Sequence, residues 1–318
     1  MERSERPVEL HVGGGRHAGP GRRAGSAAAA MVAAAITVML VSTALPAAAQ
    51  QVADTQRSDA ADPEASPTWQ KVRVSLFQSR SIDTDASNVV ALESPSRAVD
   101  AAVVPIGIRA RFDQSESRYI DKLYLIVDKN PSPISAVFRL SPLSGRADIE
   151  TRIRVEEYSF IRVVAELNDG SLHMATRFIK ASGGCSAPAG RDTARAMANL
   201  GRWKLRLEGE PQAGRPLQAQ LMISHPNESG LAMDQVTRTY ASPHFVRQVE
   251  VSYAGQLVLS ADIDFSISEN PNFRFWFTPR DRAGDLEVKF VDNRDLAFEG
   301  SVAVGPGGRS EGGSADPR

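Results

Sequence analysis

The stretch 104–112 reads VPIGIRARF, and its apolar residues recur at every second position. Ile106, Ile108, Ala110 and Phe112 fall on one side of an extended chain, and the residues between them are small or basic. A period of two is typical of a β-strand with one face in a core and the other towards solvent. This stretch therefore predicts a half-buried strand.

The same alternation returns along most of the chain, in short segments separated by turn residues. The sequences DKNP (128–131), SG (144–145) and NDG (168–170) are typical of turns between strands. Many short strands at such spacing predict an all-β protein made of two immunoglobulin-like antiparallel β-sandwiches. Besides 104–112, the expected strands are 119–128, 134–140, 149–155, 160–167, 172–179, 203–207, 217–223, 246–253, 256–263, 273–277, 286–291 and 298–304.

The expected strands form two groups, which predicts two domains, 67–182 and 200–304. A short helix over 67–78 opens the first domain, because Ser66-Pro67 is a helix-start signal and apolar residues follow at helical spacing. Residues 183–199 begin with GGCSAPAG and include a weakly helical stretch, so we expect a flexible linker there. The small and polar residues of 50–66 and 305–318 predict a flexible spacer and a disordered tail.

The first 49 residues have the pattern of an export signal. An arginine-containing leader precedes an apolar run, and Ala47-Ala48-Ala49 offers a small-residue cleavage site. An uncleaved membrane anchor is the alternative, because the apolar run is close to a membrane-spanning length. The alanine triplet favours cleavage, and we expect a periplasmic protein. Arg22-Arg23 leaves open whether export uses the general or the twin-arginine route.

Composition excludes several classes of protein. Of the 318 residues, 42% are apolar and 24% are charged, as in an ordinary soluble globular protein. The formal net charge is −1, so no extended basic surface for nucleic acid is indicated. Other proteins are the expected partners, with neither nucleic acid nor, after signal cleavage, a membrane.

Cys185 is the only cysteine, and its surroundings predict an exposed thiol. It lies between two glycines and Ser-Ala-Pro, whereas a buried cysteine usually has apolar neighbours in a strand or helix. Gly183 and Gly184 allow the backbone to move and to enter a narrow channel, which makes them a candidate hinge. No general base lies nearby in the sequence. This pattern suits a thiol on which other proteins act better than a catalytic nucleophile.

The chain carries no recognised metal, cofactor or catalytic pattern. The spacing of His173, His225 and His244 matches no zinc site, and no nucleotide-binding or hydrolase motif is present. We therefore expect no catalytic residues, no metal and no cofactor. The segment SHPNESG (224–230) follows a strand, so His225 is either a turn residue or part of a docking loop that also includes Pro226, Glu228 and Gly230.

Two sets of motifs resemble the SoxYZ sulfur carrier, with both subunits fused in one chain. The SoxY-like set comprises VVP (103–105), VDKNPSP (127–133), TRIR (151–154) and the terminal GGC (183–185). The SoxZ-like set comprises SHPNESG (224–230), SENP (268–271) and VDN (291–293). The fused order is most similar to the SoxYZ-like carriers associated with quinoprotein dehydrogenases.

This resemblance implies a carrier that is not itself an enzyme. Cys185 would be the covalent attachment point for a sulfur intermediate of the thiosulfate type, with Gly183 and Gly184 as its hinge. Partners would be periplasmic Sox-type redox and hydrolytic enzymes, or a PQQ-dependent alcohol dehydrogenase system. Unlike a SoxY subunit, in which the chain ends shortly after this cysteine, residues 186–318 follow here, so the arm is tethered at both ends.

Two other hypotheses remain open. The sandwiches could be a binding or assembly module for the dehydrogenase or its cytochrome, with an incidental thiol. Enzymatic activity is the weakest hypothesis, because the sequence shows no acid–base constellation.

Overall fold

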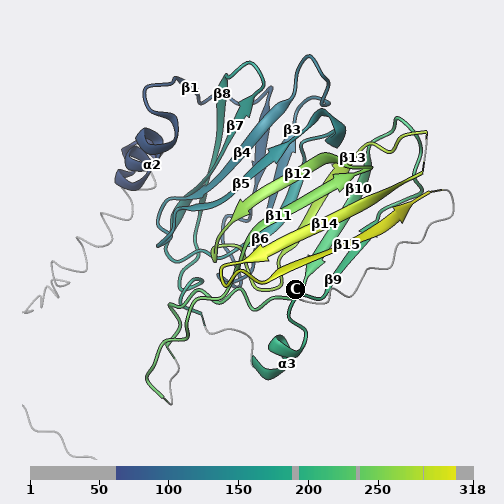
Figure 1. Cartoon of the computed structure of the whole chain (residues 1–318). Helices are drawn as coiled ribbons and strands as arrows, with labels where there is room; N and C mark the ends of the chain where they lie inside the picture. The colour runs from purple at the N-terminus through teal and green to yellow at the C-terminus, as the bar shows by residue number, and fades with distance from the viewer. Residues whose placement is uncertain (1–61, 188–192, 234–236, 282, 306–318) are drawn as a thin grey trace, which may run out of the picture. The chain divides into compact units, whose positions relative to one another are not determined.

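The computed structural model describes residues 62–187, 193–233, 237–281 and 283–305, and the side chains of 193–195 are not described. The described part of the chain consists mainly of β-strands (Figure 1). The expected export signal (1–49), nearly all of the spacer and most of the tail lie outside the described residues. Among the described helices, none is both long and apolar enough to cross a membrane.

The expected N-terminal helix is confirmed as α2, Pro67–Phe77. The Ser66 hydroxyl caps it by accepting the Trp69 backbone N–H, at an N···O distance of 3.3 Å, and Pro67 occupies the first turn. Trp69 and Phe77 are fully buried, in a cluster that includes Val164 and Met174. The helix thus covers part of the outer side of the larger sheet. It is preceded by a short 3₁₀ helix, Pro63–Ala65.

All thirteen expected strands are present, with ends that differ by a few residues at most. Two further short strands, β1 and β2, were not expected. The first half contains β1 (Ile82–Asp83), β2 (Val90–Glu93), β3 (Val104–Ala110), β4 (Ile120–Val127), β5 (Ile134–Leu140), β6 (Ile149–Ile153), β7 (Ser159–Leu167) and β8 (Leu172–Ile179), with a 3₁₀ turn at Pro142–Ser144. The second half contains β9 (Trp203–Leu207), β10 (Leu217–Ile223), β11 (Val246–Tyr253), β12 (Gln256–Ile263), β13 (Asn272–Phe277), β14 (Gly284–Asp292) and β15 (Ala297–Val304).

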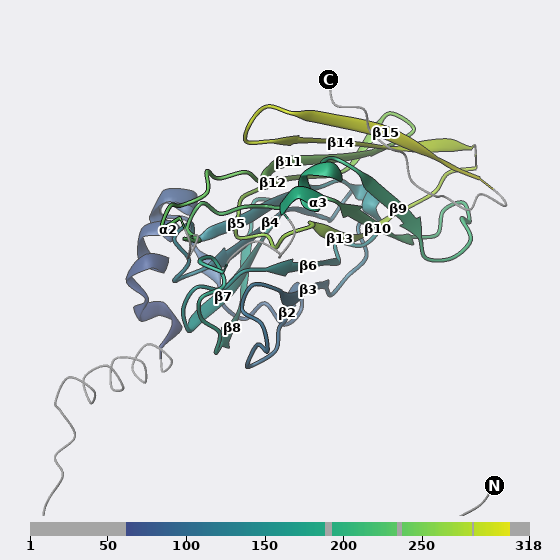
Figure 2. The ribbon, with the colours of Figure 1, turned by 90° about the horizontal axis from the view of Figure 1, so that it is seen from below.

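The two halves share both of their sheets. The larger sheet has the order β1-β8-β7-β4-β5-β12-β11-β14-β15, and the smaller has the order β2-β3-β6-β13-β10-β9. Strand β5 pairs antiparallel with β12, and β6 pairs with β13 (Figures 1 and 2). The chain therefore joins the halves by main-chain hydrogen bonds in each sheet, in addition to the covalent connection.

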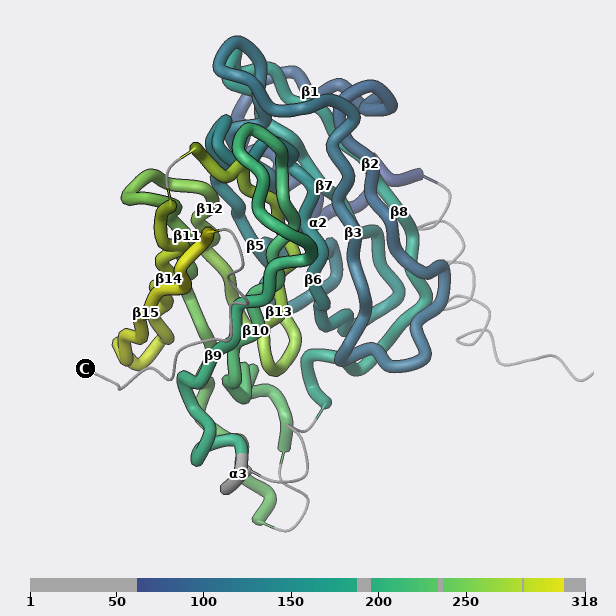
Figure 3. The backbone as a smooth tube through the Cα atoms, turned by 90° about the vertical axis from the view of Figure 1, so that its right-hand side faces the viewer, coloured from purple at the N-terminus to yellow at the C-terminus, as the bar shows by residue number. Residues whose placement is uncertain are grey.

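The core is continuous across this junction. In β10 the buried positions alternate with partly exposed ones, which is the pattern of a strand with one face in a core. The rings of Phe138 in β5 and Phe273 in β13 meet edge to face, with centroids 6.1 Å apart, so they link the two sheets and the two halves together. The all-β, immunoglobulin-like class is confirmed, and the division at 182 and 200 stays a prediction. The expected weak helix is present as α3, Thr193–Ala198 (Figure 3).

Candidate functional site

The structure contradicts the expectation that the thiol of Cys185 is exposed on its tethered arm. Its relative solvent exposure is 0%. The segment 183–186 is docked against the residues that follow β6 and against a loop of the second half. The cysteine is buried because polar groups that are distant in the sequence bind the backbone of this segment. Its burial therefore does not require apolar neighbours in the sequence.

The carboxylate of Glu156 is the main anchor of the docked segment. Its Oε2 accepts the backbone N–H groups of Cys185, at 2.8 Å, and of Ser186, at 3.1 Å. Its Oε1 accepts the Ser186 hydroxyl at 2.8 Å. Hydrogen bonds to an ionised carboxylate are stronger than those between neutral groups. One side chain thus fixes two successive residues, including the cysteine.

The two glycines of the expected hinge play different structural roles. Gly183 has a φ of +80°, where most other residues are strained, and a Cβ added there would meet nothing within 4 Å. A Cβ added at Gly184 would lie 2.7 Å from the backbone nitrogen of Val155 and would collide with the carbonyl of Ala101. Gly184 is therefore needed for the close approach of two backbones. Whether the pair also acts as a hinge stays a prediction.

The second half of the protein completes the docking. Ser229 donates its hydroxyl to the carbonyl oxygen of Cys185 at 2.6 Å, and its own oxygen accepts the backbone N–H of Leu231. Ser229 belongs to the possible docking loop that was expected from the sequence, with His225, Pro226, Glu228 and Gly230. His225 and Pro226 are buried, which favours the turn alternative for His225. Docking of a partner by Glu228 and Gly230 stays a prediction.

In the docked state the thiol has little tendency to ionise. Burial raises the pKa of Cys185 to about 12, and the negative charge of Glu156 acts in the same direction. The buried guanidinium of Arg154 opposes this shift. Arg154 is held by donating to the backbone carbonyl of Asn227 at 3.0 Å. Because the thiolate is the reactive form, the docked cysteine is protected from reaction.

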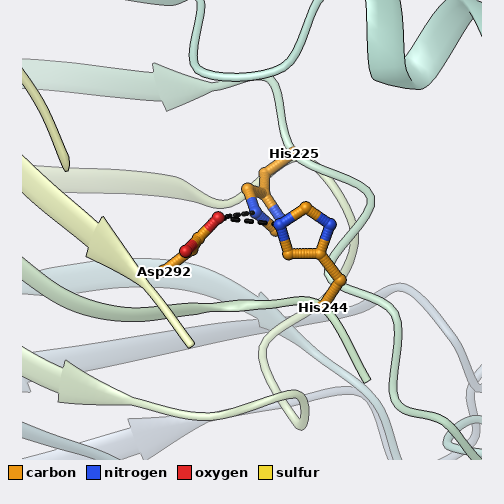
Figure 4. Close-up of side chains that lie close together, drawn as sticks. All are labelled: His225, His244 and Asp292. Atoms are coloured by element: carbon orange, nitrogen blue, oxygen red, sulfur yellow. Dashed lines mark hydrogen bonds and ion pairs between the residues drawn. The ribbon is translucent and has the colours of Figure 1, made fainter. Parts of the chain in front are cut away.

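A buried cluster of His225, His244 and Asp292 supports the loop that carries Ser229 (Figure 4). His244 Nε2 lies 2.7 Å from Asp292 Oδ2, and His225 Nε2 lies 3.6 Å from the same oxygen. The other carboxylate oxygen accepts the backbone N–H groups of Arg294 and Leu296. This cluster was not apparent from the sequence, because its members are separated by 19 and 48 positions and match no known spacing.

The hydrogen bonds of this cluster favour a protonated Nε2 on His225, which cannot bind a metal ion. The backbone N–H of Asn227 donates to His225 Nδ1 at 3.0 Å, so the proton of the neutral ring is on Nε2, the atom that faces Asp292. A metal would need the lone pair of Nε2, which would move the proton to Nδ1, where the Asn227 N–H already points. We therefore interpret the cluster as a carboxylate that accepts a hydrogen bond from His244, while the N–H of His225 faces the same oxygen at the longer distance of 3.6 Å.

This cluster predicts a loss of stability in mild acid. Burial, together with the neighbouring His244, lowers the pKa of His225 to about 4 from its usual 6.5. The unfolded chain therefore binds a proton near pH 6.5 that the folded protein takes up only near pH 4, so stability is full above 6.5 and falls as the pH drops towards 4. His225 alone therefore contributes an expected loss of about 3 kcal/mol. Burial raises the pKa of Asp264 to about 6 from its usual 3.8, which stabilises the folded protein as the pH falls below 6 and opposes that loss. Urea unfolding at several pH values should show that wild type loses about 3 kcal/mol more stability between pH 6.5 and 4 than the His225→Gln variant does. Equal profiles for the two proteins would contradict this assignment.

Comparison with known protein families agrees with the arrangement of the two halves. The family model described as sulfur oxidation protein SoxY matches residues 73–185, and the model described as sulphur oxidation protein SoxZ matches residues 205–303. The chain is a fused protein of the SoxYZ type. Both families are sulfur-oxidation carrier proteins, and their partners are Sox sulfur-oxidation enzymes. In this SoxYZ-type chain the SoxY match ends at Cys185, the docked cysteine.

Other comparisons add nothing on function. No curated protein sequence matches the chain. Among solved structures, red sea bream transglutaminase is 15% identical (TM-score 0.20), with 77% of this chain and 34% of that chain covered. A glycosyl hydrolase family 2 member from Bacteroides cellulosilyticus is 9% identical (TM-score 0.21), with 65% and 24% covered. The serine protease VesC from Vibrio cholerae is 10% identical (TM-score 0.17), with 60% and 47% covered. The chain thus spans less than half of each of these structures, and similarities this weak support no inference about its function.

Proposed function

We propose that this protein carries a sulfur intermediate of the thiosulfate type, bound covalently to Cys185, between partner enzymes. The main support for this proposal is the position of Cys185. It ends the SoxY match and lies on a segment that is docked by side-chain and backbone hydrogen bonds and is part of no strand. Such a segment can undock without breaking either sheet.

The docked and undocked states would have different chemical roles. In the docked state the thiol is buried and protonated, which protects it from side reactions. In the undocked state it loses the desolvation that raises its pKa, so its thiolate fraction increases. The two backbones that meet at Gly184 and the Glu156 anchor would then separate. Release of the arm is thus the step that makes the thiol available.

Two steps would load the sulfur group onto Cys185 and then cleave it. Cys–SH and thiosulfate give Cys–S–S–SO₃⁻, one proton and two electrons, and the electrons pass to a redox partner protein. Water then converts Cys–S–S–SO₃⁻ into Cys–S–SH and hydrogen sulfate, with no change in electron count. The described residues around Cys185 supply the docking contacts, and both steps are assigned to partner enzymes.

The test is the intact mass of the purified protein after incubation with thiosulfate and a Sox-type redox partner. Wild type should gain one S₂O₃ unit, and this gain should be absent in the Cys185→Ser variant. Serine keeps the backbone contacts with Glu156 and Ser229, so loss of the adduct would be due to loss of the thiol. Absence of any adduct that depends on Cys185 would contradict the carrier proposal.

A second candidate function is an assembly module with an inert thiol, and the burial of Cys185 favours it. The two hypotheses differ in a deletion strain that is complemented with Cys185→Ser. Full rescue would support the assembly module, whereas the carrier proposal predicts no rescue.

We further propose that the protein acts in the periplasm after cleavage near Ala49. Its partners there would be Sox-type enzymes or a PQQ-dependent alcohol dehydrogenase system. The signal-like sequence of 1–49 supports the location. The N-terminal residue of the mature protein and the proteins that co-purify with it would test these two points.

A further inference from the structure

The outward-facing side of the smaller sheet carries several arginines, and those near its middle are neutralised. Arg109 in β3 pairs with Glu93 at 3.0 Å and with Glu150 at 2.6 Å. Arg274 in β13 lies 3.4 Å from Glu150 and 3.5 Å from Glu208. Charges paired in this way attract little from solution, because each cation has its own carboxylate.

A cleft near the end of the same sheet has a different charge pattern. Its volume is about 720 Å³, and its cationic lining residues are Arg152, Arg202 and Lys204. No Asp or Glu is among the lining residues, and none of the three cations forms an ion pair with a carboxylate in the part of the chain that the structure describes. Three amide side chains, those of Asn199, Asn270 and Asn272, also line the cleft. The cleft therefore combines an excess of positive charge with further hydrogen-bond donors.

The guanidinium of Arg152 uses only part of its hydrogen-bonding capacity within the described protein. Its Nη2 donates to the carbonyl oxygen of Asn270 at 3.2 Å, and its Nε is buried and has no hydrogen-bond partner. A buried N–H group without a partner costs free energy, and the guanidinium fork fits the oxygens of an oxyanion well. Lys204 and Arg202 are exposed at the same cleft, so an anion can reach it from solvent.

We propose that this cleft binds a tetrahedral oxyanion of the sulfate, thiosulfate or phosphate class. Arginine and lysine would provide the charge, and the amide side chains would provide additional donors to the oxygens. The volume leaves room for the hydration waters of a small anion in addition to the ion itself.

The walls of the cleft continue directly into the segments that dock Cys185. Arg152 precedes Val155 and Glu156 in the chain, and Ser224 precedes the loop that contains Ser229. Asn199 follows α3, which comes after the cysteine segment. An oxyanion in the cleft would thus be bound by the same stretches of chain that hold the docked segment 183–186. Its role as a holding site for the anion that is loaded or released at Cys185 rests on the proposed function, whereas the binding site does not.

The experiment is calorimetric titration of the full chain with sodium sulfate, sodium thiosulfate and sodium phosphate at constant ionic strength. The Cys185→Ser background is used, because it prevents a covalent adduct. We expect saturable binding of at least one of these anions and about fivefold weaker binding after Lys204→Gln, which removes an exposed charge without removing a described contact. Arg152→Gln should weaken binding at least as much.

Arg206→Gln is the matched control, because Arg206 is also exposed on β9 but does not line the cleft. It should change the affinity less than twofold. Absence of saturation for all three anions, or equal weakening by Lys204→Gln and Arg206→Gln, would overturn the proposal. Failure here with a normal Cys185 adduct would leave the carrier function intact. Saturable binding without any adduct would reject the carrier function alone.

Discussion

Gly184→Ala should expose the cysteine. The new methyl group would lie 2.7 Å from the Val155 nitrogen and would collide with the Ala101 carbonyl, and backbone atoms cannot move aside as a flexible side chain can. The docked segment is held by a few hydrogen bonds, so the least costly response is undocking. Overpacking costs about 1–3 kcal/mol or more, and we expect iodoacetamide to react with Cys185 about 10- to 100-fold faster than in wild type.

Gly170→Ala controls for the general effect of placing alanine at a glycine. Gly170 has a positive φ, +84°, unlike Gly184, and its Cβ would meet nothing within 4 Å, so alanine there strains the backbone without a collision. It lies in the turn between β7 and β8, where strain should not affect the reaction of Cys185. An alkylation rate in Gly184→Ala that equals the wild-type rate, with the fold intact by circular dichroism, would contradict the docking role of this glycine.

Asp292→Ala should cause the largest loss of stability. The carboxylate is fully buried and accepts from His244 at 2.7 Å and from the backbone N–H groups of Arg294 and Leu296. Removal of one member of a buried charged network leaves its partners unsatisfied and costs about 3–5 kcal/mol. For a chain of this size we expect a melting temperature roughly 10 °C lower, as measured by calorimetry.

Asp295→Asn is the matched control in the same turn, because asparagine removes the charge and tolerates the left-handed φ of +64° at this position. Asp295 also forms an ion pair, with Arg247 at 2.7 Å, but its side chain is 82% exposed. Exposed ion pairs contribute about 0–1 kcal/mol, so its melting temperature should stay within a few degrees of wild type. If the two variants were destabilised equally, the buried cluster would have no special role.

The strands could be predicted because the alternation of buried and exposed positions in each strand is visible in its own residues. In β10, Leu217, Ala219, Leu221 and Ile223 are buried and alternate with partly exposed residues, so the period of two appears in the sequence itself. The α2 helix was predicted for a similar reason, since Ser66 and Pro67 mark its start locally. The strands β1 and β2 were missed because two and four residues are too few to show a period.

The pairing between the halves could not be predicted in the same way. Strand β5 and its partner β12 are more than a hundred residues apart, and the residue pattern of neither strand specifies which strand it pairs with. The strand pattern predicted two sandwiches. The structure adds that both sheets run through the junction.

The expected exposure of Cys185 was wrong for a related reason. Local sequence correctly indicated a segment that belongs to no strand or helix, but burial was decided by Glu156, 29 residues earlier, and by Ser229, 44 residues later. The lack of room for a Cβ at Gly184 is likewise a property of the folded chain. A glutamate close to the SoxY-like TRIR motif was visible in the sequence, but its role as an acceptor for distant backbone groups was not.

We propose that Cys185 carries a sulfur group in the working protein. Trypsin cleavage after Lys180 and Arg191 yields the peptide ASGGCSAPAGR, which contains the only cysteine of the chain. The most direct measurement is the mass of this peptide from protein recovered, without reductant, from cells that oxidise thiosulfate. We expect that a fraction of the peptide carries added sulfur or S₂O₃, and that a reductant removes this addition. A peptide that is always the unmodified thiol, under loading and resting conditions alike, would contradict it.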